Sequence, residues 1–328
     1  MSRQIVTVLG AGSWGKALAR ILNQKDLEVR LWGRSLKALQ GLTLLAENGI
    51  NLPDVTLEPD IKLALQNADW IVMALPSAAV TELAQKVAPL LESRTRIASG
   101  TKGLHPQNGL RPSQLWEQAG VPLKKFVSFS GPNLAKEIVA GVPTSMVVAS
   151  PDEDATRGAQ QLLAFPNLRV YRNTDLIGVE LGGALKNVVA IAAGICDGLG
   201  FGDNTKAALI TRGWSEMTRL ALKLGARQET LYGLSGMGDL IATCASSQSR
   251  NHSIGALLGK GFGLQDAQQK IGHVAEGVHT TLAALQLAEE QKVELPITWQ
   301  LKKVLFEGYN AGEAVAQLMS RPERNELE

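Results

Sequence analysis

The chain has 328 residues, of which 45% are hydrophobic, and its formal net charge is +2 at pH 7. A chain of this length predicts about two domains with a sizeable core. The near balance of charge argues against a nucleic-acid-binding surface but allows a small anionic substrate. Cys196 and Cys244 are too few for a disulfide framework, so we expect two buried thiols in a reducing compartment.

Neither a metal site nor a membrane span is expected. The histidines, His105, His252, His273 and His279, show no short ligand spacing, and no Cys-x-x-Cys occurs. The first apolar run is too short for the core of a signal peptide. The most apolar helical stretch, Val188–Cys196, falls short of the ~20 residues that cross a bilayer. We therefore expect a cytoplasmic protein.

The first part of the chain alternates strand and helix signals. A helical pattern follows the first predicted strand, and Val80–Leu91 has the same helical period. This alternation predicts an α/β fold built on a doubly wound, Rossmann-type sheet. Apolar and β-branched runs predict strands at Ile5–Leu9, Glu28–Trp32, Asp69–Leu75, Arg94–Ser99, Phe126–Ser130, Thr144–Ala149 and Leu168–Tyr171.

The second part of the chain is predicted to be all helical. We expect a boundary at 178/179, with residues 1–178 binding a dinucleotide and residues 179–328 forming a substrate and dimerisation domain. The absence of a low-complexity linker predicts close packing of the two domains around a cleft. Helical periods predict helices at Leu181–Ile195, Lys206–Leu224, Leu264–Ile271, Thr280–Gln291 and Ile297–Phe306.

A Gly-x-Gly-x-x-Gly motif, Gly10-Ala11-Gly12-Ser13-Trp14-Gly15, follows the first predicted strand and opens a helix. Gly10 would permit the tight turn, Gly12 the approach of backbone to a pyrophosphate, and Gly15 close packing of helix on strand. The helix N-terminus would offer free N–H groups and a positive dipole to phosphates. Such a motif alone is weak, but its strand–turn–helix context and a second strand about twenty residues on favour a dinucleotide site over a structural turn.

The end of the second predicted strand bears on the choice of cofactor. A site selective for NAD usually has an acidic residue there, which binds the ribose hydroxyls. Here the sequence is Leu31-Trp32-Gly33-Arg34-Ser35, without an acid. Because an arginine can pair with a 2′-phosphate, we expect NADP to be preferred, with NAD also accepted. The alternative for Arg34 is an exposed surface cation.

Further motifs follow in a fixed order along the chain. With the glycine motif, the segments are Gly10–Gly15, Leu31–Arg34, Ala98–Leu104, Ser130–Glu137, Leu181–Ala190, Gly198–Asn204, Ser235–Asp239, Gln248–Asn251 and Val274–Gly277. In these segments the chain resembles the bacterial-type NAD(P)-dependent glycerol-3-phosphate dehydrogenases, from about Ile5 to about Val315. The resemblance implies a cytoplasmic, dimeric enzyme that converts dihydroxyacetone phosphate into the glycerol 3-phosphate used in phospholipid synthesis.

Lys186 is the candidate catalytic residue. It lies inside an apolar helix, one turn after Gly182 and Gly183, which would let another backbone or the cofactor approach closely. A protonated lysine can polarise a ketone and donate a proton to its oxygen. A neutral lysine can take the proton back, which demands a pKa below about 10.4. The resemblance implies this role, together with substrate contact; without it, a snorkelling lysine is the simpler interpretation.

Two further charged residues are candidates for the site. Lys102 follows a strand end, where open α/β sheets bind ligands, and the resemblance implies contacts with both substrate and cofactor. The alternative is a loop cation. Asp239 opens a helix, so it could be an ordinary N-terminal acid. The resemblance makes Asp239 a substrate-site carboxylate, which we expect to orient Lys186 or a substrate hydroxyl.

Ser249, Arg250 and Asn251 precede a helix that we expect to begin near Ser253. Arginine, hydroxyl and amide donors at a helix N-terminus suit a phosphate dianion, although a capping cluster would look the same. The resemblance implies that these residues bind the substrate and that Arg250 also contacts the cofactor.

The resemblance also implies substrate or cofactor contacts at positions where the local sequence gives no such signal. The family usually has Ser or Thr after Gly131-Pro132, where this chain has Asn133, whose reach and donor pattern differ. Gly131 and Asn133 would contact substrate. Ser13, Trp14, Ala135, Val274 and Glu276 would contact cofactor.

Two other functions stay open at this point. A β-hydroxyacid dehydrogenase of similar architecture would also place a lysine on the Lys186 helix, although the 249–251 cluster favours a phosphate. A non-catalytic NAD(P)-binding sensor could keep the glycine motif, but the joint presence of Lys102, Lys186 and Asp239 argues against it. Asp203-Asn204 does not make the oxygen cage that a metal needs.

Overall fold

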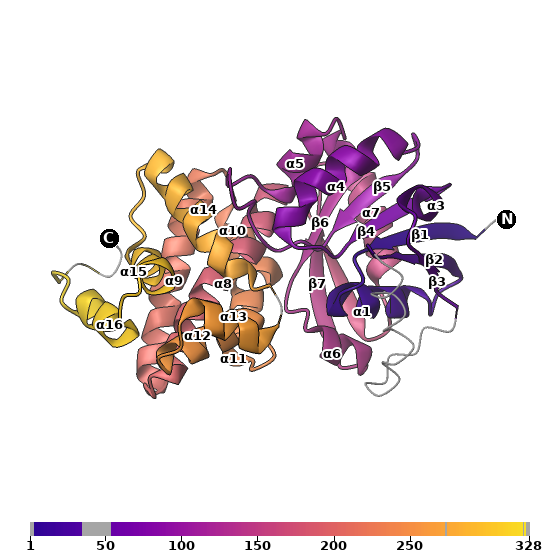
Figure 1. Ribbon diagram of the computed structural model, residues 1–328. Helices are drawn as coiled ribbons and strands as arrows, with labels where there is room; N and C mark the ends of the chain where they lie inside the picture. The colour runs from indigo at the N-terminus through magenta and orange to yellow at the C-terminus, as the bar shows by residue number, and fades with distance from the viewer. Residues whose placement is uncertain (1–2, 35–53, 273, 324, 326–328) are drawn as a thin grey trace.

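The computed structural model describes residues 3–34, 54–272, 274–323 and 325. It has a sheet-containing part from the first half of the chain and a helical part from the second (Figure 1). The last strand ends at Asn173 and the following helix begins at Leu176. The proposed boundary at 178/179 therefore falls in the first turn of that helix.

Within the described residues, the strands form one eight-stranded sheet in the order β3-β2-β1-β4-β5-β6-β7-β8. All neighbours are parallel except β6 and β7, which are antiparallel. The chain order reverses at β1, which lies between β2 and β4, and ligands of open α/β sheets bind outside the carboxyl ends of strands at such a point. The strands are β1 (Gln4–Leu9), β2 (Leu27–Trp32), β3 (Thr56–Glu58), β4 (Trp70–Met73), β5 (Arg96–Ser99), β6 (Phe126–Ser130), β7 (Thr144–Ala149) and β8 (Leu168–Asn173).

Helices cover both faces of the sheet, because buried residues alternate between the faces along each strand. Val6 and Val8 of β1 belong to the core shared with α1, α6 and α7, whereas Leu9 belongs to the core shared with α3, α4 and α5. The helices are α1 (Ser13–Leu22), α3 (Ile61–Leu65), α4 (Val80–Val87), α5 (Pro112–Gln118), α6 (Ala135–Val139) and α7 (Glu153–Leu163), with short 3₁₀ helices η2 (Ser77–Ala79), η3 (Ala88–Leu90) and η4 (Leu123–Lys125).

The helical part is built around α8 (Leu176–Gly198), which runs through its middle (Figure 1). Among the described residues α8 is the helix long and apolar enough to cross a membrane, but 94% of its most apolar window is buried inside the protein. The surrounding helices are α9 (Asp203–Lys223), α10 (Gln228–Leu231), the π-helix η5 (Leu234–Gly238), α11 (Asp239–Ala245), α12 (Arg250–Gly259), α13 (Leu264–Ile271), α14 (Glu276–Gln291), α15 (Pro296–Phe306) and α16 (Ala311–Met319).

A glycine seam, which we define as Gly194 and Gly198 of α8 with Gly255 and Gly259 of α12, brings these two helices into backbone contact. A Cβ atom at any of the four positions would overlap a backbone carbonyl oxygen of the other helix. Glycine costs helix stability, roughly 0.5–1 kcal/mol relative to alanine. The loss of helix propensity at these positions is therefore balanced by close packing of the middle and C-terminal end of α12 on α8.

The predicted strands are confirmed, as are the helical character of the second part and the burial of both cysteines. Four helices begin earlier than predicted: those expected at Leu181, at Lys206, near Ser253 and at Thr280 begin at Leu176, Asp203, Arg250 and Glu276. For two of them the physical reason is a cap. The Asp175 carboxylate accepts from the Gly178 N–H at 2.8 Å, and the Ser249 hydroxyl accepts from the His252 N–H at 3.3 Å. The short strand β3 and the helices α3, α5, α6, α7, α10 and α16 were not predicted.

Candidate active site

The glycine motif adopts the geometry that its sequence predicts. Gly10 has φ of +115°, a conformation that favours glycine, and a Cβ there would lie 2.7 Å from the Ala74 carbonyl oxygen at the end of β4. A Cβ on Gly15 would overlap the Gly10 carbonyl oxygen, whereas a Cβ on Gly12 would meet no atom within 4 Å. No side chain caps the N-terminus of α1. The first N–H groups of α1 are therefore not used by a side-chain cap, and the space beside Gly12 is open.

Trp14, the second residue of α1, packs against the carboxyl ends of β5 and β6. Its ring packs on Phe129 of β6 at a centroid distance of 6.3 Å, and a Cβ on Gly100 would lie 2.8 Å from the indole Nε1. Ser13, the first residue of α1, is exposed, and so is Arg34 just beyond β2. The structure thus places Arg34 at the carboxyl end of the sheet, on the side of β1 away from β4.

The ammonium of Lys186 is buried among polar groups of the helical part. Its Nζ donates to Asp239 Oδ1 at 2.5 Å and to the Thr243 hydroxyl at 2.7 Å. Thr243 in turn donates to Asp239 Oδ1 at 3.2 Å. Lys186 is only 5% exposed and Asp239 only 2%, so this lysine is paired rather than snorkelling.

Lys102 reaches the same carboxylate from the sheet part. Its Nζ donates to Asp239 Oδ2 at 2.7 Å and to the Gly131 carbonyl oxygen at 2.8 Å. One carboxylate therefore holds two ammonium groups, one on each oxygen. Ser130 lies close by, with its hydroxyl 3.5 Å from Asp239 Oδ2. The cluster joins the carboxyl ends of β5 and β6 to α8 and α11.

Burial and neighbouring charges set the protonation behaviour of this cluster. Burial lowers the pKa of Lys186 to about 8; Asp239 opposes this change and Lys102 adds to it. Burial alone would raise the pKa of Asp239, but the two ammonium groups and their hydrogen bonds outweigh it and hold that pKa below its ordinary value. Lys186 can thus exchange a proton near neutral pH while Asp239 stays ionised.

The glycines before Lys186 allow the close approach expected of them. A Cβ on Gly182 would lie 2.9 Å from the Ser235 carbonyl oxygen, and a Cβ on Gly183 would lie 2.7 Å from the Ser130 hydroxyl. Here the approaching atoms are protein atoms: the backbone of η5 and the end of β6. Both contacts press α8 against the elements that carry Asp239 and Gly131.

A chain of amide hydrogen bonds joins Lys186's neighbour to the 249–251 cluster. Asn187 Nδ2 donates to the Lys102 carbonyl oxygen at 2.9 Å, and Asn251 Nδ2 donates to Asn187 Oδ1 at 2.8 Å. The Gly277 N–H donates to Asn251 Oδ1 at 2.9 Å. The Asn251 side chain is thus committed to protein partners on both its amide nitrogen and its oxygen.

The remaining predicted site residues lie around this cluster with different exposures. Arg250 is exposed at the N-terminus of α12, whose first turn holds no acidic residue. Ala135 is the first residue of α6, and Val274 is 46% exposed. Glu276 is the first residue of α14, and its carboxylate accepts hydrogen bonds from Ser77 of the sheet part.

Asn133 has an unusual environment. Both polar atoms of its side chain are buried and have no hydrogen-bond partner in the described part of the protein. It lies two residues after Gly131, whose carbonyl oxygen binds Lys102 and whose φ is +138°. An unsatisfied buried amide costs free energy, so a polar group that bonds this side chain would stabilise it.

Sequence reasoning missed four residues that the structure brings to the cluster or its neighbours: Thr243, Ser130, Asn187 and Ser77. Thr243 follows Asp239 by four positions on α11, so the two share a helix face. Asn187 is a polar residue in an apolar helix, which is a signal that it needs a buried partner. Ser77 carries no comparable local signal, because its partner Glu276 is 199 positions away.

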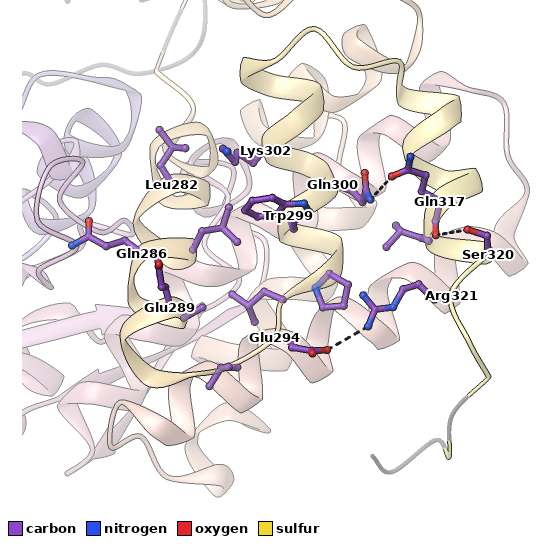
Figure 2. Close-up of a pocket in the computed structure, with 16 residues that line it drawn as sticks. Leu282, Gln286, Glu289, Glu294, Trp299, Gln300, Lys302, Gln317, Ser320 and Arg321 are labelled. Atoms are coloured by element: carbon purple, nitrogen blue, oxygen red, sulfur yellow. Dashed lines mark hydrogen bonds and ion pairs between the residues drawn. The ribbon is translucent and has the colours of Figure 1, made fainter.

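A hollow of about 920 Å³ lies elsewhere, between α14, α15 and α16 (Figure 2). Its edge includes Leu282, Trp299 and the pair Arg321–Glu294, whose charged groups are 3.4 Å apart. None of the residues that line it belongs to the predicted site. No group of three metal-ligating side chains occurs among the described residues either.

The chain that carries this glycine motif and this lysine cluster matches one known family over most of its length. Residues 5–156 match the NAD-dependent glycerol-3-phosphate dehydrogenase N-terminus, and residues 175–316 match the C-terminus of the same enzymes. The chain belongs to the NAD-dependent glycerol-3-phosphate dehydrogenase family. The suspected resemblance is thereby confirmed.

Relatives of the family cover the chain almost completely. A glycerol-3-phosphate dehydrogenase (NAD(P)+) of Carboxydothermus hydrogenoformans is 44% identical over 329 residues, covering 98% of each chain. The Bacillus subtilis enzyme of the same name is 44% identical and covers 98% of this chain and 96% of its own. The crystal structure of glycerol-3-phosphate dehydrogenase from Coxiella burnetii superposes with a TM-score of 0.89 at 37% identity, covering 97% of this chain and 99% of its own.

The comparisons do not favour a hydroxyacid dehydrogenase. The ternary structure of D-mandelate dehydrogenase with NADH and anilino(oxo)acetate shares the fold, but with a TM-score of 0.59 and 12% identity. This likeness reflects common architecture alone. The family members described above agree with this chain in both sequence and fold, so the glycerol-3-phosphate dehydrogenase family is the assignment.

Proposed function

We propose that this protein is an sn-glycerol-3-phosphate dehydrogenase that uses NAD(P). It would transfer hydride reversibly between NAD(P)H and dihydroxyacetone phosphate, giving glycerol 3-phosphate for glycerophospholipid synthesis. The observation that carries the proposal is the Lys186–Asp239–Lys102 cluster at the carboxyl ends of β5 and β6. Family membership supplies the substrate, and the cluster supplies the proton chemistry.

The residues around α1 fit a dinucleotide. The uncapped N-terminus of α1 and the open space beside Gly12 suit a pyrophosphate, and Gly10 and Gly15 keep the turn tight enough for it to approach. Ser13 and Trp14 would line the same edge. When bound, the reduced nicotinamide supplies the hydride. We assign Ala135, Val274, Glu276, Lys102 and Arg250 to the remaining cofactor contacts, as the resemblance implies.

Arg34 bears on which cofactor is preferred. It is exposed beyond the carboxyl end of β2, and no acidic residue occupies that strand end. An arginine there can pair with the 2′-phosphate of NADP, whereas an acid would bind the ribose hydroxyls of NAD. We therefore propose that NADP is preferred and that NAD is also used.

Lys186 would perform the proton transfer. In the reductive direction its ammonium donates a proton to the carbonyl oxygen of dihydroxyacetone phosphate while the carbonyl carbon receives hydride. In the oxidative direction the neutral amine accepts the proton of the glycerol 3-phosphate hydroxyl. Asp239 and Thr243 hold the amine in place. Lys102 brings a second positive charge toward the developing oxyanion.

The N-terminus of α12 would bind the substrate phosphate. Arg250 and the N–H groups of the first turn offer positive charge, and the turn contains no acid to compete with the phosphate. Ser249 caps the helix, and the Asn251 side chain already bonds Asn187 and Gly277. We propose that Ser249 and Asn251 serve the phosphate mainly by fixing this helix end.

Asn133 and Gly131 would contact the rest of the substrate. The Gly131 carbonyl oxygen holds Lys102, so it orients a cation of the site. The Asn133 amide carries a free donor and a free acceptor, which together suit a hydroxyl group that both donates and accepts. A Ser or Thr, which the family usually has here, could make one such contact with a shorter reach.

Assembly and location follow from the family resemblance. We propose that the chain forms a homodimer in the cytoplasm, with the helical part providing the dimer contact. Light scattering coupled to size-exclusion chromatography should give twice the mass of one chain. A mass equal to one chain over the working concentration range would contradict the homodimer.

The experiment that tests the function is an absorbance assay of purified protein with dihydroxyacetone phosphate, run in parallel with NADPH and NADH. Rapid oxidation of NADPH, with slower oxidation of NADH, is expected. If both cofactors bind and neither is oxidised, the assignment of substrate is wrong. A β-hydroxyacid or a sensing role would then have to be considered again.

A further inference from the structure

Ser77 links the sheet part to the helical part through one carboxylate. It follows β4, begins η2 and is 1% exposed. Its N–H donates to Glu276 Oε1 at 3.2 Å, and its hydroxyl donates to Glu276 Oε2 at 2.5 Å. Glu276 is the first residue of α14, so both hydrogen bonds of Ser77 cross between the two parts of the chain.

The Glu276 carboxylate takes its hydrogen bonds from Ser77. Burial raises its pKa, and the Ser77 hydrogen bonds oppose this change more than the charges of Arg250 and His279 do. It lies tightly against Gly103, where an added Cβ would overlap Oε2. A buried carboxylate is tolerated only when hydrogen bonds replace its lost water. Removal of the Ser77 hydroxyl would therefore leave a charged group with one donor fewer, and the start of α14 would lose its anchor.

The start of α14 is itself tied to the phosphate end of the site. The Gly277 N–H donates to Asn251 Oδ1 at 2.9 Å, and Asn251 continues to Asn187 and then to the Lys102 carbonyl oxygen. This series of hydrogen bonds starts at Ser77, after β4, and ends at Lys102, after the neighbouring strand β5. Between these points it passes through the first turns of α14 and α12 and the middle of α8.

We propose that Ser77 is a positioning residue for the substrate phosphate. By holding Glu276 it fixes the first turn of α14, and through Gly277 and Asn251 it fixes the first turn of α12, where Arg250 lies. Ser77 does not touch the substrate in this scheme; it acts through Glu276. This inference rests on the proposed function, because it takes the N-terminus of α12 to be the phosphate site.

The test compares a substrate that has the phosphate with one that lacks it. The value of kcat/KM is measured for dihydroxyacetone phosphate and for dihydroxyacetone, with NADPH, in the wild type and in Ser77→Ala. We expect Ser77→Ala to lower the value for dihydroxyacetone phosphate about tenfold or more, mainly through KM, and to leave that for dihydroxyacetone nearly unchanged. Calorimetric binding of glycerol 3-phosphate should weaken by a similar factor.

Thr95→Ala is the matched control. The Thr95 hydroxyl is buried and donates to the Ala68 carbonyl oxygen at 2.7 Å, before β5 and at the opposite end of that strand from the site. This variant loses one buried hydrogen bond of the sheet part without a link to the helical part. Both variants should lower the melting temperature, but Thr95→Ala should keep the wild-type ratio of the two kcat/KM values.

Glu276→Gln keeps the volume of the side chain and provides a second test if Ser77→Ala does not accumulate as folded protein. Because Glu276 is also assigned to the cofactor, the ratio of the two kcat/KM values is measured at saturating NADPH for each variant. The double variant Ser77→Ala/Glu276→Gln should be no worse than the worse single variant, since both act on one contact. An unchanged ratio in Ser77→Ala and Glu276→Gln would show that Ser77 is structural only. Failure of the proposed function looks different: the wild type itself would not reduce dihydroxyacetone phosphate.

Discussion

Lys186 Nζ lies 2.5 Å from Asp239 Oδ1, and this pair joins the longest helix of the described chain, α8, to the first residue of α11. The pair is buried, but the lysine is not locked in its charged form. Burial lowers the pKa of Lys186 to about 8 in spite of the carboxylate. An acid and base that works in both directions near neutral pH needs this balance of attraction and desolvation.

The first prediction concerns the proton donor. Lys186→Ala should lower turnover of dihydroxyacetone phosphate by ~10²–10⁴-fold, because the carbonyl oxygen loses its proton source. Lys186→Met, which keeps most of the volume, should show the same loss with less destabilisation. NADPH affinity, measured by quenching of protein fluorescence, should stay close to that of the wild type in both variants.

Lys206→Ala is the control for this prediction. Lys206 also pairs with an aspartate at 2.7 Å, but its partner is Asp197 at the far end of α8. Partly exposed pairs of this kind contribute little, so turnover should be nearly unchanged. Wild-type turnover in Lys186→Met would contradict the assignment of Lys186 as proton donor.

The second prediction is a pH dependence whose direction reverses with the direction of the reaction. Reduction requires the protonated lysine, so kcat/KM for dihydroxyacetone phosphate should be full below pH about 8 and should fall above it. Oxidation requires the neutral lysine, so kcat/KM for glycerol 3-phosphate should rise through the same pH. Initial rates in both directions across this range provide the measurement.

Asp239→Asn sharpens the pH test. The negative charge of Asp239 raises the pKa of Lys186, so its removal should move the inflection of both profiles to lower pH. Activity should fall as well, because Lys102 loses the same partner. If the inflection stayed where it is in the wild type, a group other than Lys186 would have to titrate.

The third prediction concerns cofactor choice. Arg34→Ala should raise the Kd for NADPH about tenfold or more, because a hydrogen-bonded charge pair with the 2′-phosphate is lost. The Kd for NADH should change little, since NADH has no phosphate at that position. Arg157→Ala, which removes an exposed arginine from α7, is the control. Equal weakening of both cofactors would mean that Arg34 does not distinguish them.

The fourth prediction separates substrate binding from stability at Asn133. Because both polar atoms of its side chain are buried without partners, Asn133→Leu should preserve or raise the melting temperature. The same change should raise KM for dihydroxyacetone phosphate, since the donor and acceptor are gone. Asn133→Ser should have the smaller effect on KM. An unchanged KM in Asn133→Leu would place this residue outside the substrate site.

The fifth prediction concerns the glycine seam. Gly255→Ala should lower the free energy of unfolding by about 1–3 kcal/mol, because its Cβ would overlap the Ile191 carbonyl oxygen on α8. Gly202→Ala is the control: its Cβ meets no atom within 4 Å, so it should cost only about 0.5–1 kcal/mol, the difference between glycine and alanine at an N-cap. Urea denaturation of both variants measures the difference.

Local pattern was sufficient for most of the fold. The strand–glycine–helix start at Ile5–Gly15 could be predicted because period, turn and helix signals agree there. Lys186 stood out because a lysine in an apolar helix requires an explanation. Helix boundaries were harder to predict from local pattern. For example, α12 begins at Arg250 rather than near Ser253, because Ser249 caps its N-terminus. Arg34 is placed where expected, but the segment after it, 35–53, lies outside the described residues.

The partners of the candidate site could not be predicted in the same way. Asp239 meets Lys186 across 53 positions of sequence, and Ser77 meets Glu276 across 199. Such contacts depend on how α8, α11 and α14 pack against the sheet, which no local window contains. The family resemblance implied that Glu276 contacts the cofactor. Only the structure shows that Ser77 donates hydrogen bonds to Glu276.

The backbone contact between α8 and α12 has a consequence for synthesis on the ribosome. α8 is apolar nearly all round, and the groove around its glycines is complementary to a helix that emerges later, after α9, α10 and α11. Until Gly255 and Gly259 leave the exit tunnel, the nascent chain exposes that groove, and exposed apolar surface favours aggregation. A chain stalled before α12 should therefore be a preferred client of chaperones, whereas one stalled before α8 should release a folded sheet part.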